Sequence, residues 1–376
     1  MKVLIIGAGI GGLAAARALS ADGHAINVFE QAPGLRRSGA AVTLWSNGTG
    51  ILDSLGVRLD GVGARIDVLE IRDARGRLLA SVDVARAAAH FGHPHICLPR
   101  AGLLERLADG LPAGLVSFGR TCTGAGQADA VTRATFADGG TADGELLVSA
   151  DGRGSAVRDQ LWGGDPAEFT GWATWQGLTS VPIDLTTEHR SVIFAGRAGT
   201  CGLMPAGEGL LQWWFDQRWL PGSPPPASPL AVLRESFGDW AAPVTDVLAA
   251  VTDDDLGFFP HFRHKVPAAW GTGRITVIGD AAHSMPPTRA QGANQALEDA
   301  WAMAAALRET SDVPVALRAF ERARSPRAAL VARRAGSEDY NNLSGQLALL
   351  MRLIPGPVAS RQYTRWLGQV SNYLAA

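Results

Sequence analysis

The sequence has few cysteines, almost no lysine and no long apolar run. Its three cysteines are Cys97, Cys122 and Cys201, and none belongs to a CxxC pair. This spacing argues against a disulfide framework and a structural zinc site, and it favours the reducing cytoplasm and no bound metal. No apolar stretch is long enough to span a membrane, and glycines interrupt the apolar N-terminus. We therefore predict a strand there and no signal peptide.

Charge of either sign is also in short supply. The 376 residues carry a formal net charge of −2, and Lys2 and Lys265 are the only lysines. No basic run with interleaved aromatic residues is present, so we expect no nucleic-acid partner. The length predicts two domains, or one domain with a large insertion, and we expect a monomer or a homodimer.

The first thirty residues hold a nucleotide-binding pattern. Residues 3–6 read as a buried strand, residues 13–20 as an alanine-rich helix and residues 25–29 as a second strand. Three glycines between the first strand and the helix form GxGxxG, at Gly7, Gly9 and Gly12. Such glycines permit a tight turn, the approach of a pyrophosphate and close helix packing. Glu30 ends the second strand, where a carboxylate holds a ribose hydroxyl, and the pattern predicts FAD or NAD equally well.

A second stretch, residues 273–301, has the form of a strand, a turn, a rigid loop and a helix. Its apolar run ends in Gly279-Asp280, Pro286-Pro287 follows, and Gln291-Gly292-Ala293-Asn294 leads into a strong helix. Ligands of open α/β sheets bind at the carboxyl ends of strands, and a helix N-terminus is partly positive. The stretch therefore suits a polyhydroxyl ligand with a part that becomes anionic. We interpret His283 as structural.

Residues 170–218 are rich in strand-like runs separated by turns. They predict an antiparallel sheet inserted into the α/β domain, followed by two helices through residue 248. We expect most of the tryptophans here to be core residues. Some should line a pocket over the sheet, because ligand sites favour aromatic walls. The candidates are Trp172, Trp175, Trp213 and Trp214.

Three motifs taken together resemble the single-component FAD-dependent monooxygenases of the p-hydroxybenzoate hydroxylase fold. They are the GxGxxG with Glu30, the Asp151-Gly152 pair and the Gly279-Asp280 loop. Salicylate hydroxylases, kynurenine monooxygenases and zeaxanthin epoxidases belong to this superfamily. The resemblance covers about residues 1–330 and implies an α/β (α+β overall) fold, with a Rossmann-like FAD-binding domain and an inserted antiparallel-sheet substrate domain. The domain division that we predict is a FAD-binding domain at residues 1–66, 98–166 and 268–330, a substrate domain at residues 67–97 and 167–267, and C-terminal helices at residues 331–376.

The resemblance also assigns roles at the cofactor. It implies that the three glycines cradle the FAD pyrophosphate, that Glu30 holds the adenosine ribose and that Asp280 binds the ribityl chain. The remaining residues expected near FAD are Arg36, Arg37, Arg100, Asp151, Pro287, Gly292, Ala293 and Asn294. Pro286, Arg289 and Gly292 would form the flavin and oxygen side of the loop, with no side-chain acid or base assigned.

The sequence departs from the family pattern at two loops. Arg289-Ala290-Gln291-Gly292 stands where Gly-Gln-Gly is usual, and Gly39-Ala40-Ala41 stands where Gly-Ala-Gly is frequent. Both put extra bulk near the expected flavin. Arg289 has three possible roles: turning to solvent or an acid, holding an anionic or carbonyl group of the substrate, or steering the oxygen species or NAD(P)H.

The implied reaction uses NADH or NADPH and O2 to insert one oxygen atom into an aromatic or polycyclic small molecule, through a flavin C4a-hydroperoxide. A role in specialised metabolism such as antibiotic biosynthesis is our expectation. A flavin-dependent reductase or dehydrogenase without oxygen transfer, a non-catalytic flavoprotein and a flavin-dependent halogenase are the alternatives, the last disfavoured because its W-x-W-x-I-P motif is missing. The sequence leaves open the substrate, the choice of hydroxylation, epoxidation or Baeyer–Villiger oxidation, and the choice of nicotinamide cofactor.

Overall fold

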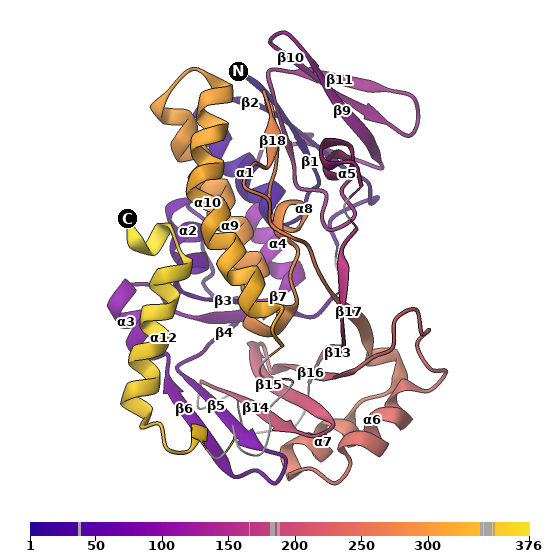
Figure 1. Cartoon of the computed structure of the whole chain (residues 1–376), viewed down its shortest axis with the longest axis vertical. Helices are drawn as coiled ribbons and strands as arrows, with labels where there is room; N and C mark the ends of the chain where they lie inside the picture. The colour runs from indigo at the N-terminus through magenta and orange to yellow at the C-terminus, as the bar shows by residue number, and fades with distance from the viewer. Residues whose placement is uncertain are drawn as a thin grey trace.

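The N-terminal strand–helix–strand unit stands at the centre of a mostly parallel sheet. The computed structural model describes residues 1–36, 39–164, 166–180, 185, 189–338, 341, 348 and 350–376. This first sheet has six strands, which lie in the upper half of Figure 1. Their order is β18 (Gly271–Thr272), β19 (Ile275–Val277), β12 (Leu146–Ser149), β1 (Lys2–Ile6), β2 (Ala25–Glu30) and β8 (Val116–Phe118). All pairs are parallel except β18 with β19, so the strands end at one edge.

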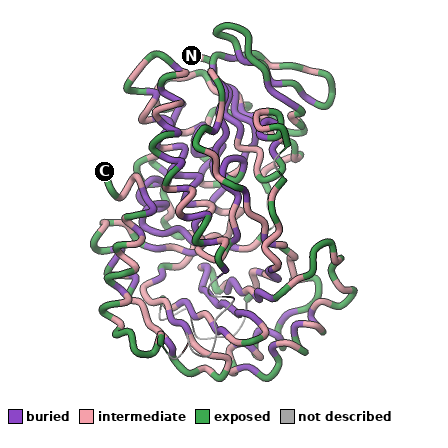
Figure 2. The backbone as a smooth tube through the Cα atoms, viewed as in Figure 1, coloured by how far each residue is buried: buried purple, intermediate pink, exposed green. Residues whose placement is uncertain are grey.

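Helices enclose this sheet because its strands are apolar on both faces. Every residue from Val3 to Ile6 in β1 is buried, as is all of β12 and β19. Figure 2 shows this buried centre against the exposed meander at the top of the molecule. The surrounding helices are α1 (Ile10–Ala21), α4 (Arg100–Ala108), α5 (Ala156–Trp162), α8 (Asp280–His283), α9 (Gly292–Glu309) and α10 (Val313–Ala335). The long helix α9 packs against both α1 and α10.

Two small sheets extend the first domain. One is a meander formed by β9 (Cys122–Ala128), β10 (Val131–Phe136) and β11 (Thr141–Gly144). The other small sheet is β3 (Ala41–Leu44), β7 (Ile96–Pro99) and β4 (Ala64–Arg65). It leads down to the second large sheet, and β7 contacts strand β15 of that sheet.

The second large sheet has seven strands and fills the lower half of Figure 1. Its order is β17 (Gly257–Arg263), β13 (Glu168–Thr179), β16 (Leu210–Arg218), β15 (Gly199–Gly207), β14 (Arg190–Gly196), β5 (Val68–Asp73) and β6 (Leu78–Asp83). Strands β5 and β6 form a hairpin at one edge of this sheet. The strands within residues 170–218 pair antiparallel, as predicted, and β5 joins β14 in parallel. That hairpin comes from a distant part of the chain, so no short turn dictates its direction.

The remaining helices cover the outside of this sheet and its junction with the first. The two helices predicted through residue 248 are α6 (Pro229–Phe237) and α7 (Ala242–Ala250), and they pack under the sheet. The other elements are α2 (Ser46–Ser54), α3 (Ala85–Phe91), α12 (Gly356–Val370), and the short 3-10 turns η1 (Asp253–Asp255), η2 (Pro287–Arg289) and η3 (Tyr373–Ala375). Among the described helices, none is both long and apolar enough to cross a membrane. The architecture confirms the predicted fold class; the domain boundaries stay a proposal.

Candidate active site

The glycine-rich loop between β1 and α1 is shaped by close approaches between backbones. A Cβ on Gly7 would lie 2.4 Å from the carbonyl oxygen of Ala150, and a Cβ on Gly12 would lie 1.9 Å from that of Gly7. Gly7 also has a φ of 98°, which side chains rarely adopt. In contrast, a Cβ on Gly9 would meet nothing within 4 Å. Gly7 and Gly12 thus serve the packing, and Gly9 leaves room for a ligand.

The carboxylate of Glu30 lies beside this loop. One oxygen accepts a hydrogen bond from the backbone N–H of Ala8 at 2.8 Å, and the other accepts one from Ala32 at 2.9 Å. These bonds fix the carboxylate at the end of β2, next to the open space over Gly9. Its contact with a ribose stays a prediction.

Asp280 and Arg100 line the same large cavity, and Asp280 is close enough to act on the charge of Arg100. Asp280 is exposed to this cavity. Burial lowers the pKa of Arg100. The negative charge of Asp280 opposes this shift, and the positive charge of Arg36 adds to it, so Arg36 lies close enough to act on Arg100. A Cβ on Gly292 would have Asp280 Oδ1 as its one neighbour, at 3.9 Å. The first turn of α9 therefore opens toward this carboxylate.

Asp151, one of the predicted cofactor residues, does not line this cavity. Arg37 lies outside the described residues. Asp151 is bonded within the protein, because Ser149 donates a hydrogen bond of 2.5 Å to its carboxylate. Burial raises the pKa of Asp151, and the bonds from Ser149 and Ser155 oppose that shift. Its neighbour Gly152 lines the cavity, so the role of Asp151 toward FAD stays a prediction.

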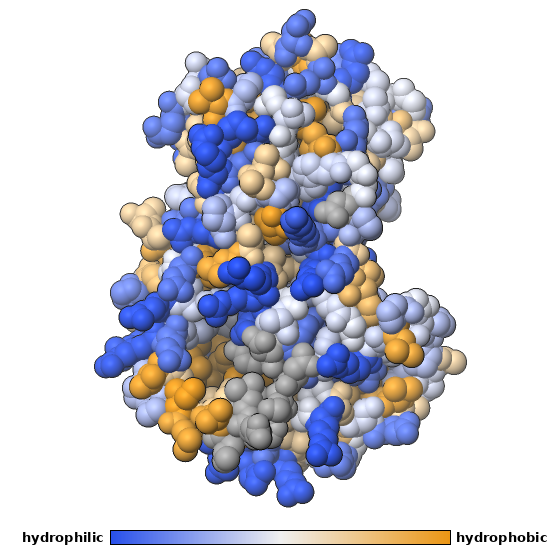
Figure 3. Space-filling view, in the orientation of Figure 1, coloured by the Kyte–Doolittle hydropathy of each residue, from blue (hydrophilic) through white to orange (hydrophobic). Residues whose placement is uncertain are grey.

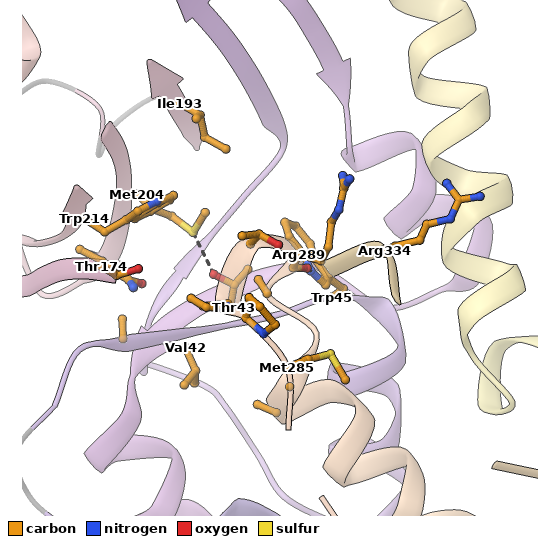
Figure 4. A pocket seen from close by; sticks show the side chains of 18 of the residues that line it. Val42, Thr43, Trp45, Thr174, Ile193, Met204, Trp214, Met285, Arg289 and Arg334 are labelled. Atoms are coloured by element: carbon orange, nitrogen blue, oxygen red, sulfur yellow. Dashed lines mark hydrogen bonds between the residues drawn. The ribbon is translucent and has the colours of Figure 1, made fainter. Parts of the chain in front are cut away.

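The central cavity has a volume of about 690 Å³ and lies between the two large sheets. Its upper wall is the edge where β1, β12 and β19 end, with Gly9, Gly152 and Asp280. Its lower wall is one face of the seven-stranded sheet, seen in Figure 4 through Thr174, Met204 and Trp214. α12 closes the remaining side with residues such as Tyr363 and Trp366.

The loop from Pro286 to Asn294 forms the rim between the two walls. Pro286, Pro287, Arg289, Gly292 and Ala293 all line the cavity. Asn294 does not, and its buried amide instead bonds the backbone of Trp45, Thr43 and Ala290 at 3.0, 3.0 and 2.7 Å. Asn294 therefore locks the loop onto β3. Figure 4 shows Arg289 between Trp45 and Arg334. The indole N–H of Trp45 donates a hydrogen bond of 3.3 Å to the backbone carbonyl of Arg289.

Only one of the four candidate tryptophans lines the cavity. The ring of Trp214 lies over Gly202, where a Cβ would fall 1.9 Å from it. Trp175 and Trp213 point to the opposite face and belong to the core under α6 and α7. Trp172 is buried and stacks with Arg218 at 4.6 Å. Trp175 and Trp213 do not line this cavity because successive side chains of a strand alternate between faces. Trp172 is two residues before Thr174 and shares its face, but it lies beyond the lining of the cavity.

A buried charged network supports the Asp280 turn and was missed from the sequence. Asp299 accepts hydrogen bonds from the N–H of Gly279 at 2.8 Å, from His283 at 2.7 Å and from Arg324 at 2.8 Å. Asp299, His283 and Arg324 are each 0% exposed. The structural interpretation of His283 is consistent with this position. Acids within a helical run usually face solvent, so the sequence carried no signal for Asp299.

Comparison with known proteins agrees with this geometry. Residues 1–335 match the family described as FAD binding domain, and the chain belongs to that family, within the FAD-dependent aromatic hydroxylases. It is 32% identical over 333 residues to a FAD-dependent urate hydroxylase of Klebsiella pneumoniae, covering 87% of this chain and 86% of the relative. It is also 32% identical to the aurachin C monooxygenase/isomerase of Stigmatella aurantiaca over 336 residues, with 87% and 86% covered.

Solved structures give the same result. Klebsiella pneumoniae HpxO, complexed with FAD and uric acid, superposes with a TM-score of 0.91 at 28% identity, covering 98% of this chain and 97% of that one. These relatives carry names of FAD-dependent monooxygenases and hydroxylases, and this chain is an oxidoreductase of that class with FAD as its cofactor.

Proposed function

We propose that this enzyme hydroxylates a small aromatic or heteroaromatic ring, with O2 as oxidant and NADH or NADPH as reductant. The observation that carries the proposal is the single cavity that joins the cofactor wall to an apolar sheet wall. The named activities of the relatives on urate, 6-hydroxynicotinate and 3-amino-4-hydroxybenzoate support the class of substrate. A site of about 300–1,000 Å³ lined largely by apolar groups suits such small molecules.

The residues of the upper wall fit FAD. The open space over Gly9 accommodates a pyrophosphate, the carboxylate of Asp280 is accessible to a ribityl hydroxyl, and the first turn of α9 offers unpaired N–H groups. When bound, FAD supplies the reduction of dioxygen and the transfer of one oxygen atom. Gly292 and Ala293 would stabilise negative charge at the helix N-terminus.

The chain's other residues orient the substrate and keep water away from it. Trp214, Met204 and Ile193 give the lower wall an apolar surface on which a flat ring can lie. Arg289 stands on the rim, where a guanidinium could hold an anionic or carbonyl group of the substrate. A reductase without oxygen transfer remains the alternative function, because the upper wall alone would serve it.

Transfer of an oxygen atom to the product distinguishes a hydroxylase from a reductase. We expect the purified FAD-loaded enzyme to consume NAD(P)H faster when a phenol, pyridinol or purine from a panel is its substrate. The product should gain one atom from labelled dioxygen, measured by mass spectrometry. Consumption of NAD(P)H without labelled product for any ring in the panel would favour the reductase.

Replacing Asp280 tests the cofactor wall. Asp280→Ala should weaken FAD binding by about 10- to 150-fold, because it deletes a charged hydrogen bond worth about 1.5–3 kcal/mol. Titration of the apoprotein with FAD, followed by flavin fluorescence, measures the change. Asp138→Ala removes an exposed acid of the meander and serves as the matched control. Equal affinities for the two variants would show that Asp280 is a turn residue only.

A further inference from the structure

A row of polar side chains crosses the lower wall of the cavity, which is otherwise apolar apart from Gln176 and Gln212. Thr174, Asp216 and Thr200 stand on three adjacent strands, where Asp216 is the direct cross-strand partner of both threonines. All three line the cavity, and each is at most 4% exposed. Thr174 donates a hydrogen bond to one carboxylate oxygen of Asp216, and Thr200 lies 2.9 Å from the other. This row is therefore a carboxylate held rigidly at the surface of the substrate space.

A second layer of polar groups supports the row from behind. His261 Nε2 lies 2.5 Å from the hydroxyl of Thr174, and His261 Nδ1 lies 2.9 Å from Glu338. Asn341 donates from its amide nitrogen to Glu338 at 2.8 Å. Glu338 has a φ of 51°, a conformation that costs energy for a residue with a side chain. The hydrogen bonds of its carboxylate with Thr170, His261 and Asn341 hold Glu338 in this position.

Counting hydrogens reveals what this network can hold. Asn341 gives its N–H to Glu338, so its carbonyl oxygen faces the hydroxyl of Thr200, at 2.9 Å. Thr200 has one proton, and with an ionised Asp216 on its other side it faces two acceptors. One of the two contacts then has no hydrogen. If Asp216 carries a proton, it donates to Thr200, Thr200 donates to Asn341, and both contacts of Thr200 have a hydrogen. One additional proton on Asp216 therefore completes the hydrogen bonds of Thr200.

We propose that Asp216 accepts the proton of a ring hydroxyl or ring N–H on a planar aromatic substrate, with Thr174 and Thr200 positioning the carboxylate. This inference rests on the proposed function and narrows its substrate class. The substrate O–H or N–H bond breaks, an O–H bond forms on Asp216, and the electron pair stays on the substrate. The hydroxyl of Thr200 turns from Asp216 to Asn341 as the proton arrives. The resulting anion is richer in electrons at its ring, which favours attack by an electrophilic oxygen.

The electrostatics of the row agree with a proton acceptor. Burial raises the pKa of Asp216, His261, Thr174 and Thr200 oppose that shift, and Glu338 adds to it. Cys201 on β15 is also in this field, and burial raises its pKa well above the ordinary value, so the thiol stays neutral. A carboxyl of raised pKa is a better base than an ordinary one when it is ionised. Below its pKa it is already protonated, so proton uptake from the substrate should fail in acid.

The other lining residues limit what can bind beside Asp216. The surface around the row is mostly apolar, with the amides of Gln176 and Gln212 beside it. Its apolar residues are Leu69, Ile71, Val82, Ile193, Met204 and Trp214. A ring with one donor group satisfies both the carboxylate and this surface. A substrate carboxylate would be repelled at this position, since Asp216 and Glu338 are both acids.

Binding of a chromophoric phenol tests the proposal without turnover. The FAD-loaded enzyme, with no reductant, is titrated with 4-nitrophenol and with nitrobenzene over a range of pH. Flavin absorbance reports binding, and the phenolate band reports proton transfer. We expect 4-nitrophenol to bind at least about tenfold more tightly than nitrobenzene and to show the phenolate band at lower pH than in water. Equal binding of the two, or no binding of 4-nitrophenol, would overturn the proposal.

Variants locate the effect at Asp216. Asp216→Asn should weaken 4-nitrophenol binding by about 10- to 150-fold and return the phenolate band to the pH at which it appears in water. Asp246→Asn makes the same change on the exposed side of α7 and should alter neither. His261→Gln removes a group that lowers the pKa of Asp216, so the band should appear at higher pH. If Asp216→Asn does not fold, the His261→Gln variant tests the proposal in its place. A phenolate band that appears at the same pH in His261→Gln as in the wild type would contradict the proposal.

The two proposals can fail separately. The nitrophenol experiment needs neither reductant nor oxygen, so a positive result stands even if no labelled oxygen enters a product. Labelled product from an enzyme whose Asp216→Asn variant binds 4-nitrophenol normally would keep the proposed function and refute the role of Asp216.

Discussion

Asp299→Ala should lower the free energy of unfolding by about 3–5 kcal/mol, the effect of breaking a buried ion pair by removing one partner. The variant leaves the guanidinium of Arg324, which is 0% exposed, with Glu298 as its nearest remaining acid, at 3.4 Å. It also leaves the buried N–H of Gly279 without its acceptor. Urea unfolding of the apoprotein measures the change. FAD affinity should fall too, since Gly279 precedes Asp280.

A surface pair of the same chemistry is the control. Arg308 and Asp22 form an ion pair at 2.9 Å with 52% of the arginine side chain exposed. Asp22→Ala should cost less than about 1 kcal/mol, because water screens the pair and replaces it. If Asp299→Ala costs no more than Asp22→Ala, the buried network does not stabilise the fold.

The stability due to Asp299 should depend on pH in one direction. Burial acts to raise the pKa of Asp299, but His283 and Arg324 outweigh it, and the pKa lies below its ordinary value. A carboxyl with a lowered folded-state pKa contributes stability above its unfolded pKa, near about 3.9, and loses it as the pH falls through the folded value. The difference between wild type and Asp299→Ala should therefore be full at neutral pH and shrink below about pH 3.9.

Gly12→Ala and Gly9→Ala should separate folding from cofactor binding. The Cβ of Gly12→Ala would lie 1.9 Å from the backbone oxygen of Gly7, so α1 must move away from β1. We expect a loss of about 1–3 kcal/mol or more in the free energy of unfolding, with loss of FAD. The Cβ of Gly9→Ala meets no protein atom within 4 Å. The apoprotein of that variant should keep its stability within about 0.5 kcal/mol.

FAD titration completes this comparison. Gly9→Ala should bind FAD at least about tenfold more weakly, a loss of about 1.4 kcal/mol in binding free energy. The added methyl group enters the space that a pyrophosphate would fill. Wild-type affinity in the stable Gly9→Ala apoprotein would show that the phosphates lie elsewhere. A Gly12→Ala apoprotein as stable as wild type would mean that the helix can shift at no cost.

The sequence by itself determined the cofactor half of the molecule. The spacing of Gly7, Gly9 and Gly12 between an apolar strand and an alanine-rich helix dictates a tight turn. Gly7 and Gly12 avoid contacts with the neighbouring strand or within a few residues, and Gly9 keeps the loop open. Asp280 was predictable for the same reason: it follows a short apolar strand, and parallel strands end at one edge. These are local rules, and they hold whatever the rest of the chain does.

The tertiary structure alone decided the substrate half. Alternation along β16 places Trp213 and Trp214 on opposite faces, but only the position of α6 and α7 tells which face is core. The group of Thr174, Thr200 and Asp216 exists because three strands pair in one register, over separations of 16 and 42 residues from Asp216. Strand register and the packing of distant segments depend on the energy of the whole fold, so no stretch of sequence encodes them separately.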